Sequence, residues 1–443
     1  MNNITGLTSN FEDFKKQVDE NSSKLNFEDS QNKIIKIRKN LILSFISDSA
    51  GCGHIRNILP MTYLNSVFGK TRQLHPVALP FFIFEPDILL HTRSLFFQRV
   101  MSQKHLPIIL KYKELQDKYK FKMIYDLDDF IFKGKNIGEC IPEYNFGSKT
   151  FSEEIIENVI KIMNLMDVVC VSTDFLKKYL KEKIGIKTEI KVVSNSVPHY
   201  FYGPKKKQLI KEKIKIPKVI WTGSPTHYMD SNYIEKNGQK ITVFPVYTPD
   251  MKIAYYKDKK GTEKYNIFDV KNDHQKGDWD NAWCEWVIKS VKDKKIKFLM
   301  MGTPKIPFFF KELIGNEYFK IIGWQNTFQY NMPILDYSAD IGIAPLVPNY
   351  FNYSKSDIKM IEYYASGSVA VGTIFSNGMP SPYDNCFNKL PDTCSVEDIE
   401  EWINIITEPE IYNKTIEKQY KYLIENNRYL ESPGYINNLC KIL

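Results

Sequence analysis

The stretch LILSFISDSAGCGHIRNILPMTYLNSVFG, residues 41–69, decides the fold class of this chain. It starts with a short apolar run (41–47), passes through a loop with two glycines, and continues with apolar residues at helical spacing. A continuous apolar run of this length is typical of a buried parallel strand. Strand, glycine loop and helix in this order form the first half of a βαβ unit. The stretch therefore predicts an α/β domain with a parallel sheet.

The same alternation occurs in two series, which a basic linker separates. In the first series we predict a strand in DILLHTR (87–93), a helix over 95–119 and a strand in FKMIYDL (121–127). The linker is PKKKQLIKEKIKIP (204–217), and the second series starts at KVIWTGS (218–224). We therefore expect two Rossmann-like domains that face each other across a cleft, with ligands beyond the carboxyl ends of the strands.

The domain boundaries follow from this pattern. Residues 231–276 break the alternation, and we predict that they form β-hairpins inserted after the first strand of the second domain. The predicted parts are an N-terminal extension (1–35), an N-terminal Rossmann-like domain (36–210), a C-terminal Rossmann-like domain (211–420) and a C-terminal helix (421–443).

The amino-acid composition indicates which kinds of partner and which cellular compartment to expect. The 443 residues carry a formal net charge of +8, which favours anionic partners such as nucleotides, DNA or acidic membranes. The seven cysteines form no CxxC pair, so we expect buried thiols and a reducing cytoplasm. We find neither a signal peptide nor a membrane-spanning apolar run, and predict a cytoplasmic protein. Abundant Lys, Asn and Ile with little Ala and Arg is typical of AT-rich genomes, including those of many bacteriophages.

The glycine loop after the first strand is a candidate ligand site. Gly51 and Gly53 let a ligand approach the backbone, and the following helix N-terminus favours negative charge. His54 and Arg56 come next and are expected to face the cleft, His54 as a catalytic candidate and Arg56 as a phosphate contact. The motif is shorter than GxGxxG, and a tight turn without a ligand is the alternative.

Three carboxylates lie close together in YDLDD (125–129), at the end of a predicted strand. Asp126 and Asp128 spell D-x-D, which holds a divalent metal in a class of sugar transferases with a single nucleotide-binding domain. In a two-domain chain, Asp128 and Asp129 are instead catalytic candidates that accept a proton or hydrogen bond from an acceptor hydroxyl. Helix capping or solvated loop acids are the alternative.

The stretch WTGSPTH (221–227) also ends a predicted strand with small residues. Backbone amides and hydroxyl groups in such a loop bind phosphate. Gly223, Ser224 and His227 are therefore candidates for binding a phosphate or a sugar. A structural histidine is the alternative for His227.

The most informative stretch is FNYSKSDIKMIEYYASG (351–367). Lys355, the Ser356 hydroxyl and unpaired backbone amides gather at the predicted start of a helix, where they suit a diphosphate. Lys359 adds a second cation. Glu362 suits the ribose hydroxyls of a nucleotide, because a carboxylate accepts two hydrogen bonds. The alternatives are a helix cap at Ser356 and an amphipathic surface helix with an isolated glutamate.

Together these stretches resemble glycosyltransferase family four, whose members have the two-domain GT-B fold. The likeness covers about residues 40–420 and rests on the segments PDILLHTR, YDLDD, VSTDFL, VVSNSVP, WTGSPTH, IGIAPL and FN-x-x-KS-x-x-K-x-x-E-Y-x-A-x-G. It implies a retaining transfer from a nucleotide sugar without a bound metal or other cofactor. Glu362 would then hold the donor ribose, Lys355 and Ser356 the diphosphate, and Gly53 would face the donor from the N-terminal, acceptor-side domain.

The chain departs from this family at two places. Family members carry a second acid eight residues before the helix glutamate, a position that Ser354 occupies here. Many also carry a basic pair soon after the first strand of the second domain, where this chain has TGSPTHYMD (222–230). Lys355, Lys359 and Arg56 therefore become the candidates for neutralising the diphosphate.

Charge and composition also bear on the acceptor. The insertion interleaves lysines with tyrosines, and Lys257, Lys259 and Lys260 are expected to contact the phosphates of double-stranded DNA. The chain is similar in this respect to bacteriophage DNA glycosyltransferases. That likeness implies transfer of glucose or arabinose from a UDP-sugar to a flipped-out 5-hydroxymethylcytosine. A cell-surface polysaccharide or lipid-linked glycan is the alternative acceptor, and a non-catalytic DNA- or sugar-binding protein is a third interpretation.

Overall fold

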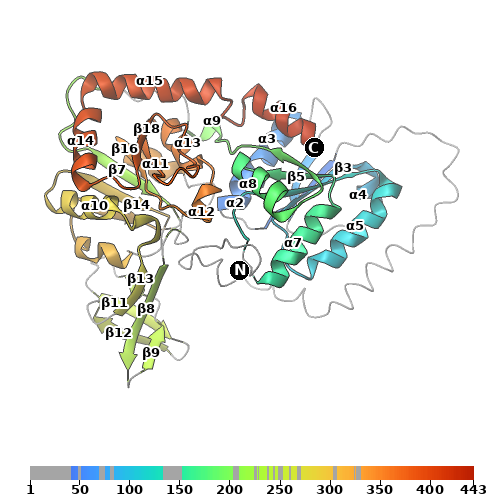
Figure 1. Cartoon of the computed structure of the whole chain (residues 1–443), viewed down its shortest axis with the longest axis horizontal. Helices are drawn as coiled ribbons and strands as arrows, with labels where there is room; N and C mark the ends of the chain where they lie inside the picture. The colour runs from blue at the N-terminus through green and yellow to red at the C-terminus, as the bar shows by residue number, and fades with distance from the viewer. Residues whose placement is uncertain are drawn as a thin grey trace.

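The chain folds into two α/β domains with a β-rich arm attached to the second (Figure 1). The computed structural model describes residues 41–47, 51–68, 75–79, 84–132, 152–202, 209–223, 227, 229–236, 239–242, 245–247, 253–258, 261–266, 271–302, 307–323, 325 and 331–443. The predicted N-terminal extension lies outside these residues. Among the described helices, none has both the length and the apolar character that a membrane span requires.

The N-terminal domain is built on a six-stranded parallel sheet in the order β2-β1-β3-β4-β5-β6. The strands are β1 (Leu41–Phe45), β2 (His75–Leu79), β3 (Thr92–Gln98), β4 (Lys122–Leu127), β5 (Val168–Val171) and β6 (Glu189–Val192). The helical segments are α2 (Gly51–Gly53), η2 (His54–Ile58), α3 (Leu59–Phe68), α4 (Pro86–His91), α5 (His105–Tyr119), α7 (Glu153–Leu165), α8 (Asp174–Tyr179), η3 (Leu180–Ile184) and α9 (His199–Tyr202). The inner strands are buried on both faces, which explains their continuous apolar sequences.

The C-terminal domain repeats this architecture with the strand order β15-β14-β7-β16-β17-β18, again fully parallel. The strands are β7 (Lys218–Thr222), β14 (Lys297–Met301), β15 (Phe319–Ile322), β16 (Ile341–Ala344), β17 (Val369–Ile374) and β18 (Asn388–Pro391). The helical segments are η6 (Gly277–Trp279), α10 (Ala282–Lys292), η7 (Phe308–Leu313), α11 (Asn331–Tyr337), α12 (Tyr350–Tyr353), α13 (Ile358–Ala365), α14 (Val396–Ile406), α15 (Pro409–Glu425) and α16 (Pro433–Ile442). Four tryptophans, Trp221, Trp279, Trp283 and Trp286, fill its core.

The predicted β-hairpin insertion forms the arm that projects from the C-terminal domain in Figure 1. One three-stranded antiparallel sheet contains β8 (Met229–Lys236), β9 (Gln239–Thr242) and β13 (Lys271–Gln275). The other contains β10 (Pro245–Tyr247), β11 (Ile253–Asp258) and β12 (Gly261–Asn266). Of the candidate DNA contacts, Lys257 lies in β11, whereas Lys259 and Lys260 lie outside the described residues.

The prediction of a strand in DILLHTR (87–93) is wrong. DILLHTR forms mainly the helix α4, and the strand β3 is the next segment, part of which we had assigned to a helix starting at residue 95. Pro86 occupies the first turn of α4 and Asp87 complements its dipole, and both are helix-start signals. Arg99, with φ of +43°, ends β3, and the helix α5 begins only at His105.

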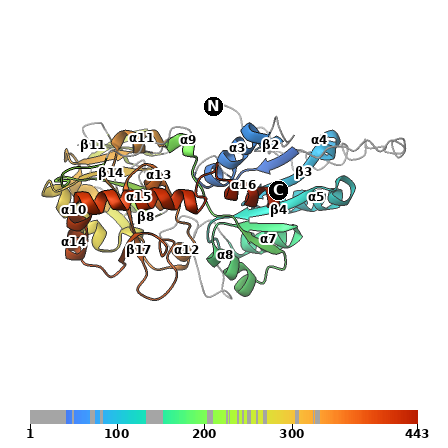
Figure 2. The same ribbon diagram turned by 90° about the horizontal axis from the view of Figure 1, so that it is seen from above.

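The C-terminal segment connects the domains. Helix α15 runs along the C-terminal domain, and α16 lies against the N-terminal one (Figure 2). Leu439 and Ile442 of α16 belong to the same apolar cluster as Phe96 of β3. In addition, Arg93 Nε donates to the Leu443 carbonyl at 3.2 Å, and Lys122 Nζ donates to the Ile442 carbonyl at 2.6 Å. The helix therefore completes the core of a domain that is distant in sequence.

Removal of one buried side chain from α16 tests this docking. We expect Leu439→Ala to lower the free energy of unfolding by about 2–5 kcal/mol, because Leu439 is 4% exposed and its loss leaves a cavity. Chemical denaturation followed by circular dichroism measures the change. The exposed Asn438 on the same helix provides the control, and Asn438→Ala should change stability by less than about 0.5 kcal/mol. Equal effects of the two substitutions would contradict the docking.

Candidate functional site

The candidate residues gather at the carboxyl ends of the two sheets, where the domains touch. Thr173 Oγ1, at the start of α8, donates to the Ser354 carbonyl of the C-terminal domain at 3.1 Å. Asn195 Nδ2, just after β6, donates to Ser356 Oγ at 2.7 Å. Phe351 is buried within the apolar core of the N-terminal domain. The predicted diphosphate turn before α13 therefore lies at the domain junction.

Four polar side chains of the C-terminal domain form one buried cluster. His227 follows β7, Asp278 comes from η6 after the insertion, and Lys355 and Lys359 flank the start of α13. His227 Nδ1 lies 2.6 Å from Asp278 Oδ2, and Lys359 Nζ lies 3.2 Å from His227 Nε2. Lys355 Nζ lies 3.6 Å from Asp278 Oδ2, and Asn352 Nδ2 donates to Asp278 Oδ1 at 2.6 Å. Three of the predicted donor-binding residues thus meet around an aspartate that sequence reasoning missed.

The contacts of His227 determine which ring nitrogen carries the proton. The Asp278 carboxylate accepts a hydrogen bond from Nδ1, so Nδ1 carries the hydrogen. Nε2 is then the unprotonated nitrogen and accepts a hydrogen bond from Lys359. Burial, together with Lys355 and Lys359, lowers the pKa of His227 to about 3, so the ring is neutral. Lys355 Nζ, 3.0 Å from Nδ1, is held there by its ion pair with Asp278 rather than by the ring.

The electrostatic balance of the cluster favours an anionic ligand. Burial lowers the pKa of Lys355, and burial and the neighbouring Lys355 lower that of Lys359 to about 7. Burial would raise the pKa of Asp278, but Lys355 and the bonds from His227 and Asn352 outweigh it and hold that pKa at about 2. Two ammonium groups therefore share one carboxylate, and an added anion would relieve their repulsion.

Two glycines allow the close packing around Lys359. A Cβ atom on Gly223 would lie 2.5 Å from the Trp221 ring and 3.0 Å from Lys359 Nζ. Gly302 has φ of +94°, and its Cβ would lie 2.6 Å from the Gly223 carbonyl oxygen. Lys359 Nζ in turn lies 4.6 Å from the centre of the Trp221 ring, a cation–π distance. Gly223 thus makes room for the lysine, while Ser224 lies outside the described residues.

Glu362 lies on α13, one turn beyond Lys359. Its side chain is buried, and Tyr202 OH donates to Glu362 Oε1 at 3.4 Å. Tyr202 belongs to α9, at the end of the N-terminal domain. The predicted ribose contact is thus placed beside the lysine cluster and next to the domain junction.

The N-terminal domain contributes a second polar cluster. Asp128 and Asp129 follow β4, and Cys52 lies in α2, because the glycine stretch predicted as a loop after β1 is helical. Cys52 Sγ donates to Asp129 Oδ2 at 3.3 Å, and Arg99 forms an ion pair with the same oxygen at 2.7 Å. Burial and the neighbouring Asp129 raise the pKa of Asp128 to about 7, where the group can exchange a proton near neutral pH. Its Oδ1 atom is buried without a hydrogen-bond partner.

These side chains also have the chemistry of a metal site. One ligand atom from each of Cys52, Asp128 and Asp129 lies within 4.8 Å of the others. The D-x-D interpretation of the sequence requires Asp126 as the second metal ligand beside Asp128. Asp126 is, however, fully buried in an ion pair with Arg56. A metal would therefore have to use Asp128 and Asp129 and would compete with Arg99 for Asp129.

Arg56 is placed in the interior and not in the lysine cluster. Its Nη2 and Nε atoms donate to the two oxygens of Asp126 at 2.5 and 3.2 Å. Nη1 donates to the Val193 carbonyl and, at 3.0 Å, to Asn195 Oδ1. The charge of Asp126 outweighs burial and raises the pKa of Arg56. We therefore do not assign the diphosphate charge to Arg56, because its donors are already engaged.

The remaining loop residues lie near the junction. His54 starts η2, and burial lowers its pKa to about 4, so the ring is neutral. Gly53 is buried. A Cβ atom on Gly51 would meet nothing within 4 Å, so this glycine borders open space.

Sequence reasoning missed Asp278, Asn195 and Arg99. Asp278 follows a long insertion, and only its place just before a helix with an apolar face could have drawn attention to it. Asn195 stands in VVSNSVP, a segment that we quoted for its likeness to the family without a role. No local pattern marks Arg99, whose partners are Cys52 of α2 and Asp129 after β4.

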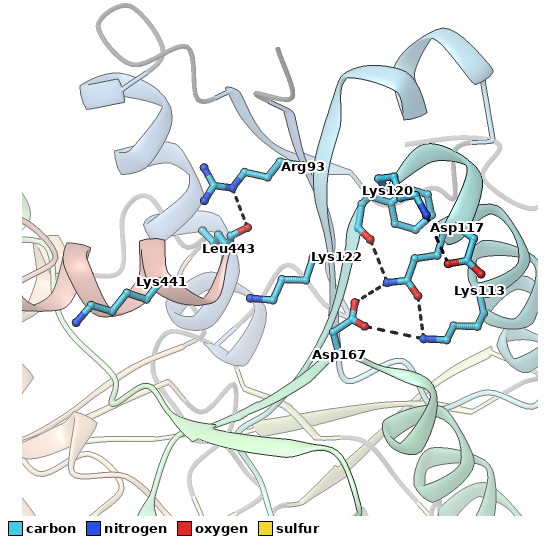
Figure 3. Close-up of a pocket in the computed structure, with 10 residues that line it drawn as sticks. Arg93, Lys113, Asp117, Lys120, Lys122, Asp167, Lys441 and Leu443 are labelled. Carbon is cyan, nitrogen blue, oxygen red and sulfur yellow. Dashed lines mark hydrogen bonds and ion pairs between the residues drawn. The ribbon is translucent and has the colours of Figure 1, made fainter. Parts of the chain in front are cut away.

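A basic pocket lies at the opposite edge of the N-terminal sheet (Figure 3). It has a volume of about 640 Å³, and Arg93 and Lys122, at the amino ends of β3 and β4, line it together with Lys441 of α16. Lys113 and Lys120, on its other side, form ion pairs with Asp167 and Asp117. None of the residues predicted from the sequence lines this pocket, so it is separate from the candidate site.

Comparisons with known proteins bear on the fold. No protein-family model and no curated protein matches the chain. A glycosyltransferase structure from Rickettsia africae is 13% identical, with a TM-score of 0.51, and the match covers 91% of this chain and 97% of that one. A sucrose-phosphate synthase structure from Thermosynechococcus elongatus is 9% identical, with a TM-score of 0.51 and coverage of 91% and 98%. The chain has the GT-B fold.

The fold expected from the sequence is thus confirmed over both domains. The structure also shows what occupies the position eight residues before Glu362, where the sequence lacks the second acid of the family. Ser354, which stands in its place, is buried and donates to the Phe351 carbonyl. The nearby carboxylate comes instead from Asp278, through its hydrogen bond with Asn352, two residues before Ser354.

The lysine cluster predicts a pH-dependent affinity for phosphate anions. Lys359 is charged below its pKa of about 7 and neutral above it, so affinity for inorganic pyrophosphate should fall as pH rises from about 6 to about 9. The expected slope is at most about tenfold per pH unit. Calorimetry measures the affinity. Pyrophosphate itself gains negative charge over this range, so the reference is Lys359→Met, which keeps the packing on Trp221. Parallel profiles for parent and variant would contradict the assignment.

Proposed function

We propose that the chain is a retaining glycosyltransferase that takes its sugar from a UDP-sugar and needs no bound metal. The observation that supports this most is the convergence of Lys355 and Lys359 on one buried His227–Asp278 pair, one turn before Glu362. The lysines and the turn at Ser356 would bind the diphosphate, and Glu362 the ribose hydroxyls. The GT-B fold provides the frame in which these residues meet.

The lysine cluster suits the charge that develops during transfer. When the bond from the sugar to the diphosphate breaks, negative charge grows on the leaving oxygen. Lys355 and Lys359 are already held in place by Asp278 and His227, so they can stabilise this charge with little rearrangement. The amides at the start of α13 add the positive end of the helix dipole.

The acid cluster of the N-terminal domain suits the acceptor side. An attacking hydroxyl must lose its proton, and Asp128, with a pKa near neutrality, is able to take it. Asp129 is held by Arg99, and its charge acts on Lys355 across the junction. The two clusters therefore belong to opposite sides of the same domain junction, which suits a donor on one side and an acceptor on the other.

For the acceptor, we propose 5-hydroxymethylcytosine in double-stranded DNA, with glucose or arabinose as the sugar. The net charge of +8 supports an anionic partner. In the arm, β11 and β12 pair in a register that sets Tyr255 opposite Lys264 and Lys257 opposite Thr262. Lysines and tyrosines that are neighbours along and across such strands suit phosphates together with an unstacked base.

Loss of Glu362 tests the donor site. Glu362→Ala should weaken UDP binding about tenfold or more, because it removes a charge-assisted hydrogen-bond acceptor worth about 1.5–3 kcal/mol. Calorimetry in excess chelator measures the dissociation constant. The exposed Glu410 on α15 provides the control, and Glu410→Ala should bind as the parent does. An unchanged constant for Glu362→Ala would remove it from the site, and binding that depends on magnesium would return Asp128 and Asp129 as metal ligands.

The arm lysines test the acceptor. Replacing Lys257, Lys259 and Lys260 together by Ala should weaken DNA binding and flatten its salt dependence by about two to three units, since each phosphate contact contributes a slope of about −0.9. Filter binding over a salt series measures both quantities. A variant with Ala at Lys414, Lys418 and Lys421, three exposed lysines of α15, makes the same change in net charge elsewhere. Equal salt slopes for the two variants would exclude the arm. If the parent does not bind DNA, a glycan is the better acceptor; if it binds DNA and UDP but transfers no sugar, the chain is a binding protein.

A further inference from the structure

A line of buried polar contacts crosses from the N-terminal domain into the diphosphate turn. Asp126 of β4 holds Arg56, and Arg56 Nη1 donates to Asn195 Oδ1 at 3.0 Å. Asn195 Nδ2 then donates to Ser356 Oγ at 2.7 Å. Arg56 and Asn195 are each 6% exposed, so the contacts of Arg56 are shielded from water, whereas the contact between Asn195 and Ser356 is partly buried.

The donor and acceptor atoms of these side chains fix the direction of each hydrogen bond along this line. A guanidinium can only donate hydrogen bonds, so Arg56 requires the amide oxygen of Asn195 on its side. The amide nitrogen, which can only donate, must then face Ser356. Ser356 Oγ therefore acts as the acceptor in this contact, and its own hydrogen is directed elsewhere.

We propose that Asn195 is a positioning residue that directs the Ser356 hydroxyl hydrogen to the diphosphate of the donor. The proposal rests on the proposed donor site. Ser356 lies between Lys355 and the start of α13, in the turn assigned to the diphosphate, and it is partly exposed. A phosphate oxygen is an acceptor, so it gains a hydrogen bond only from a serine whose proton is not already donated within the protein.

The same contact couples donor binding to the approach of the domains. Asn195 belongs to the N-terminal domain and Ser356 to the C-terminal domain, and Thr173 bonds the neighbouring Ser354 carbonyl. The Ser356 hydroxyl is thus oriented only while the two domains are in contact. Arg56, which the sequence predicted as a direct phosphate contact, acts on the Ser356 hydroxyl through Asn195 while its own charge is paired with Asp126.

Reversal of the amide polarity tests the proposal. In Asn195→Asp both side-chain oxygens accept, so Arg56 keeps a partner while Ser356 must turn its hydrogen towards the new carboxylate. UDP affinity, measured by calorimetry, should fall about tenfold, as for the loss of one charge-assisted bond. Ser356→Ala should cause a loss of similar size. The added carboxylate also repels the diphosphate directly, and the Ser356→Ala background measures that charge effect alone. The loss from Asn195→Asp should therefore be clearly smaller in that background than in the parent, because Asn195 acts through the Ser356 hydroxyl.

Two comparisons make the outcome decisive. Thr173→Ala removes the adjacent interdomain bond and leaves Ser356 oriented, so its loss of UDP affinity should be clearly smaller. Thermal melting of every variant shows whether it is folded. Equal losses for Thr173→Ala and Asn195→Asp, or a loss from Asn195→Asp that is as large in the Ser356→Ala background as in the parent, would overturn the proposal. If the parent protein and Asn195→Asp bind UDP equally well, the positioning role of Asn195 is refuted and the donor site is not. If the parent protein binds no UDP, the donor site is refuted and this inference with it.

Discussion

Two lysine side chains beside a neutral imidazole that is bonded to one buried carboxylate are the constraint on which the candidate site depends. A buried ammonium group is costly unless it has a partner, and here Lys355 and Lys359 share Asp278 and His227. This arrangement keeps both cations in place and leaves positive charge unbalanced while Lys359 is protonated. It also requires glycine at Gly223 and Gly302, because any larger residue would displace the packing around Lys359.

The parallel sheets bring this cluster to the domain junction. In each sheet the carboxyl ends of the strands lie at one edge, so the loops after β1, β4 and β7 lie on the same side of their domains. The N-terminal domain presents Asp128, Asp129 and Cys52 there, and the C-terminal domain presents the lysines. The contacts of Thr173 and Asn195 with the turn at Ser354 and Ser356 hold the two sets together.

Ion pairs at the junction divide the charged residues into two groups. Arg56 and Asp126 neutralise each other inside the N-terminal domain, and so do Arg99 and Asp129 nearer its surface. Lys359 and Asp128 instead have pKa values near neutrality, where a group exchanges protons readily. One lies on the proposed donor side and one on the proposed acceptor side, which is the separation of roles that a group transfer needs.

The alternation of strands and helices, the inserted β-hairpins and the residues that follow the strands could be predicted from the sequence alone, because hydrophobic periodicity and turn residues are local signals. The strand predicted at 87–93 is wrong, since the apolar DILLH run resembles a strand until Pro86 and Asp87 are recognised as a helix start. Which polar side chains pair with one another depends on the tertiary packing. Arg56 and Asp126 are 70 residues apart, His227 and Asp278 are 51 apart, and Asn195 and Ser356 are 161 apart. Nothing in a local stretch specifies which distant charge a buried side chain meets, because that choice is made when the sheets and domains pack.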